Sequence, residues 1–199
     1  TQTVADKFLF EHALVKSHSN YVSPSKFREL SKSPQVMMKT IGGPSTNIIT
    51  SMALSGGNVG LIGRIGNDEL GHFYASQISK YNVSYAPVVS TDKPTTALMS
   101  YITPDKERSF AVLDGAGGSL SVEDIDLELI NRARFTHIDL FLLFTEKGQE
   151  TVDYVTDYAL SSGGQLAVSL NCEALMSKQR NRVQNLVEHA ALVVGSMDE

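Results

Sequence analysis

The stretch that decides the fold is "GGPSTNIITSMALSGGNVGLIGRIGNDELG", residues 42–71. It begins with two glycines and a proline directly before an apolar pattern, and Asn47 lies in the first turn of that pattern. The apolar side chains recur at i, i+1, i+4 and i+5, which predicts a helix from about Ser45 to Ser55. Gly56 and Gly57 then provide its C-terminal stop.

The glycine pair allows two interpretations. Unpaired N–H groups at a helix start, together with the helix dipole, suit a phosphate or a ring of ligand hydroxyls. Gly42 and Gly43 would let such a ligand reach the backbone, and Asn47 could offer both a donor and an acceptor. The alternative is a tight strand-to-helix turn with a solvated Asn47. Neither a Walker A loop nor a G-x-G-x-x-G fingerprint is present here.

Short apolar runs alternate with helical periodicity along the middle and later chain, which is typical of an α/β protein. The later elements have the order βαβαβ, which predicts a parallel sheet with helices on its faces. A turn of Pro and Asp at 103–107 predicts a hairpin. The predicted extended segments are 8–21, 59–63, 85–89, 95–103, 108–113, 135–144, 166–170 and 191–194. The predicted helices are 45–55, 67–81 with Asn67 or Asp68 as N-cap, one that opens with a capping box at 121–124, 145–160 and 177–189.

The composition narrows the class of protein. With 199 residues, 42% of them hydrophobic, the chain can bury one sizeable core. A net charge of -5 without a Lys/Arg block argues against nucleic acid or an anionic membrane as partner. A single cysteine, Cys172, excludes an intramolecular disulfide and fits a reducing compartment. The first residues do not form a secretory signal, so a cytoplasmic location is expected.

The thirty residues quoted above resemble the first signature of the ribokinase-like, or PfkB-type, carbohydrate kinase family. In that family a Gly-Gly pair precedes a helix carrying an Asn, a Gly follows the helix, and a G-x-I-G-x-D-x-x-G pattern closes the run. The matching residues are Gly42, Gly43, Asn47, Gly57, Gly63, Gly66, Asp68 and Gly71. Farther along, 93–110 resembles the paired lid strands that close over the sugar, and 115–126 resembles the return to the main sheet.

The resemblance implies a three-layer αβα fold with a mainly parallel, Rossmann-like sheet and a small β-sheet lid. Relative to the family, the chain looks truncated at both ends, with most of the ATP-binding part expected after Glu199. The implied division is 1–40 for lid strands and connection, 41–90 for the α/β core, 91–115 for lid strands and 116–199 for the continuing core.

The resemblance also implies an activity: transfer of the γ-phosphate of ATP to a hydroxyl, in particular a hydroxymethyl, of a sugar or nucleoside. Gly42, Gly43 and Asn47 would bind the substrate hydroxyls, and Asp139 matches a strand-end carboxylate that contacts substrate in some members. Asp139 could instead be a cap or an ion-pair partner. In the lid, Met99 and Tyr101 would shape the substrate pocket.

The nucleotide half of the implied site falls at or beyond the last residue. Glu199 matches the Glu of the family's N-x-x-E motif, which would act through water on Mg²⁺. The catalytic Asp belongs to a later G-A-G-D motif, expected beyond Glu199, because "GAGG" at 115–118 follows the lid strands and lacks the Asp. The fragment alone is therefore expected to be inactive.

Two departures from the family pattern keep other functions open. Ser196 stands where N-x-x-E begins with Asn, and Cys172 stands near a place where relatives often carry Asp. They favour, as an alternative, a non-catalytic sugar- or nucleoside-binding relative of these kinases. A third reading is a generic nucleotide domain whose "GGPSTN" cradles phosphate. A homodimer through the lid strands is compatible with the resemblance.

Overall fold

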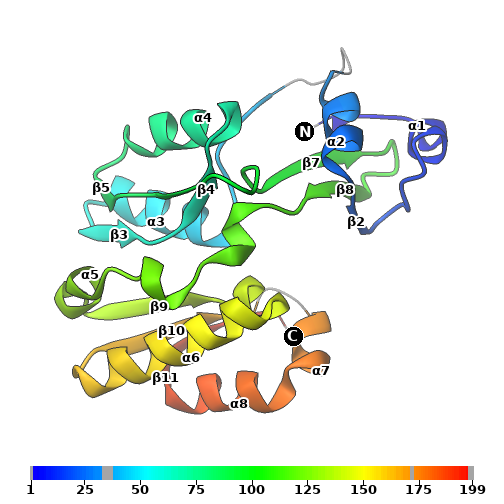
Figure 1. Cartoon of the computed structure of the whole chain (residues 1–199). Coiled ribbons are helices and arrows are strands. Elements are labelled where there is room, and N and C mark those ends of the chain that lie inside the picture. Colours follow the sequence, from blue (N-terminus) through cyan, green and yellow to red (C-terminus); the bar gives the residue numbers. More distant parts are fainter. Residues whose placement is uncertain (1, 33–37, 171–172, 197–199) are drawn as a thin grey trace.

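The computed structural model describes residues 2–32, 38–170 and 173–196 of the chain. Figure 1 shows three regions: a lid at the upper right, an upper layer at the left and a lower layer beneath it. None of the described helices is both long and apolar enough to span a membrane.

The lower layer is a parallel sheet with helices on one face. Its elements are α5 (Leu127–Arg132), β9 (Phe135–Asp139), α6 (Glu146–Ser161), β10 (Gln165–Ser169), α7 (Glu173–Lys178), α8 (Arg180–His189) and β11 (Ala190–Val194). The strand order is β11-β10-β9, and both pairings are parallel. Leu166 and Val168 of β10 are buried against apolar residues of α6 and α8, so this face forms the main core.

The upper layer combines two helices with two short strand pairs. Its elements are α3 (Pro44–Leu54), β3 (Val59–Leu61), β4 (Arg64–Gly66), α4 (Glu69–Ile78), β5 (Val83–Tyr85) and β6 (Val88–Ser90). β3 pairs with β5 and β4 with β6, both in parallel. Asp68 is the N-cap of α4, because its carboxylate accepts the Gly71 N–H at 2.8 Å.

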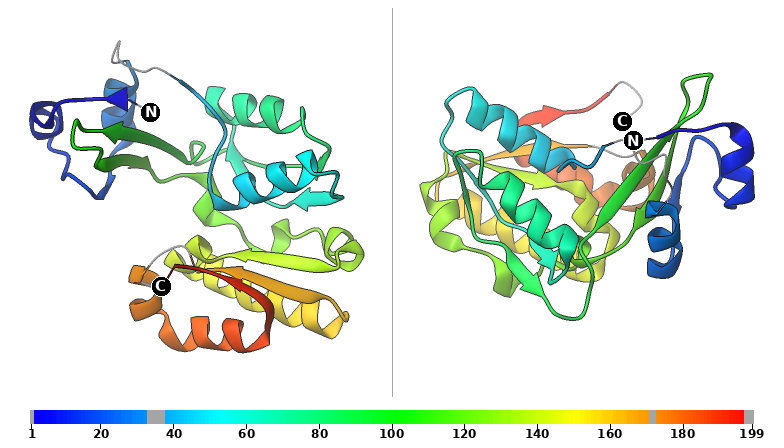
Figure 2. Two further views of the ribbon diagram at one scale, coloured as in Figure 1. Left: turned by 180° about the vertical axis from the view of Figure 1, so that it is seen from behind. Right: turned by 90° about the horizontal axis from the view of Figure 1, so that it is seen from above.

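The lid is a four-stranded sheet with two helices on one face. It contains β1 (Gln2–Thr3), α1 (Asp6–Glu11), β2 (Ser19–Tyr21), α2 (Pro24–Ser31), β7 (Ala97–Ile102) and β8 (Arg108–Leu113). β7 and β8 form an antiparallel hairpin, and the sheet order is β1-β7-β8-β2. Figures 1 and 2 show α1 and α2 on the side of this sheet turned away from the rest of the chain.

Two predicted strands are wrong in part. Residues 8–21 were expected to be extended, but Asp6–Glu11 forms α1, because burying Leu9 in the lid core outweighs its weak local pattern. The run 135–144 was expected to be one strand, but it stops at Asp139. There the Asp139 side chain accepts the Phe141 N–H at 3.0 Å and caps a 3₁₀ helix.

Other boundaries also differ from the predictions. The capping box at 121–124 is present, yet it opens only a 3₁₀ turn, and α5 starts later from its own N-cap, Asp126. The predicted helix 177–189 is divided into α7 and α8. The predicted strand 85–89 is divided at Pro87, which has no N–H to donate to a ladder. The 3₁₀ helices of the described chain are η1 (Ala116–Ser119), η2 (Val122–Asp124) and η3 (Leu140–Phe144).

Candidate functional site

The start of α3 is open. Gly43 is its N-cap residue with φ +97°, a backbone conformation that favours glycine, and Pro44 follows at the first helical position. A Cβ added to Gly42 or Gly43 would meet nothing within 4 Å, so both glycines face open space. Because no side chain caps this helix, its first N–H groups remain available to a ligand.

Asp139 lies beside the first turn of α3. The Ser45 hydroxyl donates to one oxygen of its carboxylate at 2.8 Å, across 94 residues of sequence, while the other oxygen accepts the Phe141 N–H. The structure thus places Asp139, at the carboxyl end of β9, next to the glycine pair. It also supports the structural alternative, since Asp139 serves as a cap.

Asn47 completes this edge of α3. Its side chain is exposed and forms no hydrogen bond within the described chain, whereas its backbone N–H donates to the Gly43 carbonyl at 3.0 Å. The amide therefore has both a donor and an acceptor to offer to a ligand.

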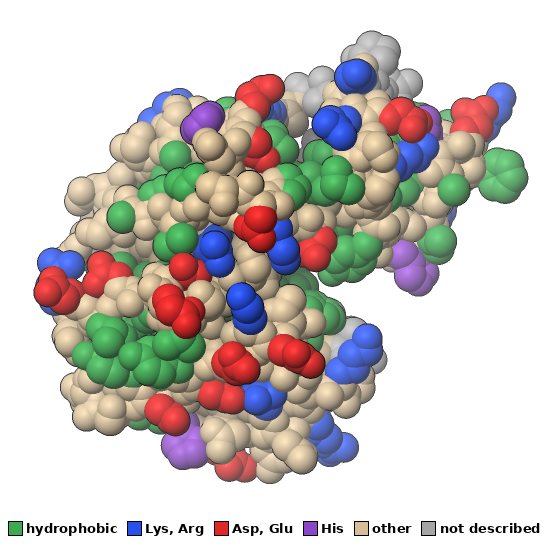
Figure 3. Space-filling view, in the orientation of Figure 1, with side chains coloured by type: hydrophobic (Ala, Val, Ile, Leu, Met, Phe, Trp, Pro, Cys, Tyr) green, Lys and Arg blue, Asp and Glu red, His purple; other side chains and the backbone are tan. Residues whose placement is uncertain are grey.

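The molecular surface has a hollow between the lid and the lower layer. Figure 3 shows this hollow at the right, between the lid above and the α7–α8 part below. In the views of Figures 1 and 2, α3 begins near the base of the lid, and it contacts β9. The carboxyl ends of parallel strands are where α/β proteins commonly bind ligands. We therefore take this edge as the candidate site.

A polar pair that the sequence analysis did not single out lies next to Asp139. A hydrogen bond of 2.8 Å joins Nε2 of His137 to the hydroxyl of Ser169, which is paired with Asp139 across β9 and β10. Burial lowers the pKa of His137, and the nearby Asp139 carboxylate opposes that shift. The sequence signal was the alternation Phe135, His137, Asp139, which places polar groups on one face of the strand.

The structure does not place Met99 and Tyr101 in the hollow. Tyr101 is completely buried in the lid core under α1 and α2, its hydroxyl donates to the Met99 sulfur at 3.6 Å, and burial raises its pKa to about 12. Alternation along β7 directs Leu98 and Ser100 to the opposite face. The structure therefore gives no support to Met99 and Tyr101 as pocket residues, because both pack into the lid core.

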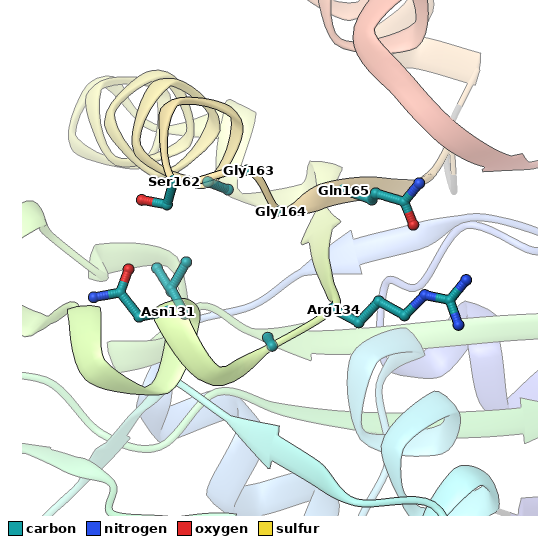
Figure 4. Close-up of a pocket in the computed structure, with 9 residues that line it drawn as sticks. Asn131, Arg134, Ser162, Gly163, Gly164 and Gln165 are labelled. Carbon is teal, nitrogen blue, oxygen red and sulfur yellow. The ribbon is translucent and has the colours of Figure 1, made fainter.

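Two cavities lie away from this edge. One of about 400 Å³ lies at the amino ends of β9 and β10, with Asn131 and Ser162 toward one end and Arg134 and Gln165 toward the other (Figure 4). The Gln165 N–H in its wall already donates to the Arg134 carbonyl. Another, of about 790 Å³, lies between α6 and α8. Neither touches α3, so we place the candidate site by its geometry instead.

Glu199 and Cys172 lie outside the described residues, and Ser196 is exposed just after β11. Within residues 2–32, 38–170 and 173–196, no cluster of three or more His, Cys, Asp or Glu side chains could hold a metal ion.

Comparison with known families identifies the chain. The pfkB family carbohydrate kinase profile matches residues 14–199. The chain belongs to this family. Among curated PfkB relatives, Fructokinase-like 1, chloroplastic, of Arabidopsis thaliana is 22% identical over 183 residues, 89% of this chain and 39% of the relative. Fructokinase-2 of Zea mays is 29% identical over 113 residues, 55% of this chain and 33% of the relative. The chain thus spans about two-fifths of the length of the curated relatives that it matches.

Solved structures confirm the ribokinase-like α/β fold. A probable sugar kinase from Rhizobium etli matches with a TM-score of 0.84 at 22% identity. The match covers 96% of this chain and 59% of the sugar kinase chain. Adenosine kinase from Sinorhizobium meliloti has a TM-score of 0.83 at 21% identity, covering 97% and 59%. The incomplete coverage of both agrees with the predicted truncation relative to the family.

Proposed function

We propose that the complete protein transfers the γ-phosphate of ATP to a hydroxyl of a sugar or nucleoside. Membership in the PfkB family supports this activity, as do the fructokinases and the adenosine kinase among its relatives. The observation that carries the proposal is the 2.8 Å hydrogen bond from Ser45 to Asp139. It joins the open start of α3 to a carboxylate at the carboxyl edge of the sheet.

The acceptor would bind through its hydroxyls at this junction. The free N–H groups after Gly43 can donate to hydroxyl oxygens, the Asp139 carboxylate can accept from a hydroxyl, and Asn47 can do both. Hydrogen bonds that involve a carboxylate are stronger than neutral ones, so Asp139 would contribute most to orientation. The lid would cover the bound acceptor and exclude water, which limits hydrolysis of ATP.

ATP and Mg²⁺ remain part of the proposal. The described residues contain no group of three or more His, Cys, Asp or Glu side chains that could hold a metal ion, and Mg²⁺ usually binds together with substrate phosphates, so no step is assigned to the ion here. Glu199 as an indirect, water-mediated contact and a catalytic Asp after it both remain predictions. A cytoplasmic location also remains a prediction, supported by the single cysteine.

A homodimer through the lid strands also remains part of the proposal. β7 and β8 are both paired on each side within the lid, so its free edges are β1 and β2, of two and three residues. Edges this short offer few unpaired groups to a second copy. A dimer through the lid would therefore have to use the face of the sheet away from α1 and α2.

A non-catalytic binding protein is the second candidate, favoured by Ser196 at the place of the family's Asn. One experiment separates the two: the complete protein is screened with ATP and Mg²⁺ against a panel of sugars and nucleosides, with ADP release and binding heat measured in parallel. ADP release with one acceptor class supports the kinase. Saturable binding without ADP release supports the binding protein, and neither result with any panel member contradicts both.

A further inference from the structure

We propose that Asp68 and Thr95 are positioning residues that fix the base of the lid and thereby set the affinity for the acceptor. The affinity part of this inference rests on the proposed kinase function. Neither residue belongs to the start of α3, although Asp68 is part of the quoted signature. Thr95 lies two residues before β7, on the segment that leads into the lid.

Three hydrogen bonds hold Thr95 in place. Its hydroxyl donates to Oδ1 of Asp68 at 2.6 Å, and its N–H donates to Oδ2 at 2.8 Å. The same hydroxyl accepts the N–H of Gly66, the last residue of β4, at 2.9 Å. Thr95 is buried, so its hydroxyl and N–H lose their hydrogen bonds to water and form these hydrogen bonds within the protein instead.

The carboxylate of Asp68 serves two elements at once. Besides the two groups of Thr95, this carboxylate accepts the Gly71 N–H in the first turn of α4. Burial acts to raise the pKa of Asp68, but the hydrogen bonds from Thr95 and Gly71 outweigh it and lower the pKa. The group is therefore ionised at neutral pH, and charge-assisted hydrogen bonds join the upper layer to the lid.

The backbones of β4, the start of α4 and the segment around Thr95 are closely packed against one another. A Cβ on Gly66 would lie 2.5 Å from the Thr95 nitrogen, and a Cβ on Gly71 would lie 2.2 Å from the Gly66 carbonyl oxygen. Both distances are far below contact range, so these signature positions require glycine because backbones meet there. Their role in this chain is to join β4 and α4 to the lid segment, not to approach a ligand.

The second end of the lid hairpin is tied to the first at the same place. After β8 the chain returns past the lid segment, where the Ala116 N–H donates to the Pro94 carbonyl at 2.8 Å. Next to it, the Gly117 N–H donates to the Thr96 hydroxyl at 3.0 Å. The chain segments before β7 and after β8 are therefore joined to each other at the base of the lid. If the lid moves as a unit, this base is where the hairpin would pivot.

The test uses the complete protein with Thr95→Val, which keeps the shape and removes the hydroxyl. Amide hydrogen exchange reports lid anchoring without any need for kinase activity. We expect protection of the Ala116 and Gly117 amides, which bond to the segment beside Thr95, to fall about tenfold or more, because the base of the lid opens locally. We also expect KM for the acceptor to rise about fivefold or more, with kcat changed less than about threefold.

Thr151→Val is the matched control. Thr151 is also buried, and its hydroxyl donates its one hydrogen to a backbone carbonyl away from the lid, that of Lys147 at 2.8 Å, with the Leu120 carbonyl also within reach at 3.1 Å. This variant should lose stability without changing lid exchange or KM selectively. Thr95→Ser, which keeps the hydroxyl, should restore both values. Should Thr95→Val fold poorly, Asp68→Asn replaces it, since Asn can still cap α4.

The outcomes separate this inference from the proposed function. Equal lid exchange in the Thr95→Val, Thr151→Val and unaltered proteins overturns the anchoring role, whatever the activity. Faster lid exchange with an unchanged KM, in a protein that does phosphorylate an acceptor, overturns the link to affinity. Faster lid exchange in a protein that phosphorylates nothing supports the anchor and removes only the kinase.

Discussion

Replacing Asn47 by Ala separates binding from folding at the candidate site. The side chain is exposed and has no partner within the described chain, so its removal breaks no contact that stabilises the fold. Ala has a higher helix propensity than Asn, by up to about 0.7 kcal/mol, so the free energy of unfolding should stay level or rise slightly. Any loss of function must then come from the ligand.

The expected loss follows from the two hydrogen bonds that an amide can make to acceptor hydroxyls. At about 0.5–1.5 kcal/mol each, they amount to about 1–3 kcal/mol. Since about 1.4 kcal/mol is a factor of ten, kcat/KM should fall by about 5- to 150-fold. The contact is made by the bound acceptor before reaction as well, so most of the change should appear in KM.

The assay is steady-state ADP release by the complete protein at varied acceptor concentration, with urea denaturation measured on the same samples. Ser51→Ala is the control, because Ser51 is exposed one turn farther along α3 and also lacks a side-chain partner in the described chain. It should leave KM unchanged. An unchanged KM for Asn47→Ala, or a loss of stability that explains the lower activity, refutes the assignment of Asn47 to the site.

Three further changes test the core and two titrating contacts. Leu166→Ala, at a fully buried position, should lower the free energy of unfolding by about 2–5 kcal/mol in urea, and exposed Leu192→Ala by less than about 0.5 kcal/mol. The hydrogen bond from Lys16 and the one from Thr103 hold the pKa of Asp105 at about 2, so Asp105→Asn should reduce lid protection at neutral pH, and its effect should shrink as the pH falls from about 4 through 2. Burial lowers the pKa of His137, so stability should fall as the pH drops below its ordinary value of 6.5, and His137→Gln should weaken that dependence.

Each of these predictions has a result that contradicts it. Equal losses for the two leucine variants would mean that β10 is not the core strand. An effect of Asp105→Asn that is as large at pH 2 as at neutral pH would show that the ion pair is not its cause. A His137→Gln variant whose stability still falls equally between pH 7 and 5 would assign that loss to other groups.

The sequence was sufficient for the parts of the fold that local patterns determine. The helix after Gly43 and the strands near 166–170 and 191–194 were predicted within about one residue, because apolar periodicity and glycine stops act over short distances. The hairpin 97–113 was predicted from its Pro-Asp turn. The family signature supplied the rest of the topology.

What failed depends on partners distant in sequence. Nothing near Leu9 in the sequence indicates that strands about ninety residues later will cover it. The segment was therefore predicted to be extended, although it forms a helix. Which face of the lid sheet Tyr101 lies on depends on the register of β7. A sequence pattern does not fix that register, and a shift of one residue moves the side chain to the other face. The bond from Ser45 to Asp139 joins two segments whose proximity is set by the fold alone.

The lid's composite origin has a consequence for the order of folding. Lys16 and Asp105, which bind each other, are 89 residues apart, and β1 and β2 add to the hairpin from the beginning of the chain. Contacts between such distant segments form late, because a long loop must close before they stabilise anything. During synthesis, α1 and α2 therefore emerge from the ribosome well before the strands that cover them, so their apolar faces stay exposed in that interval.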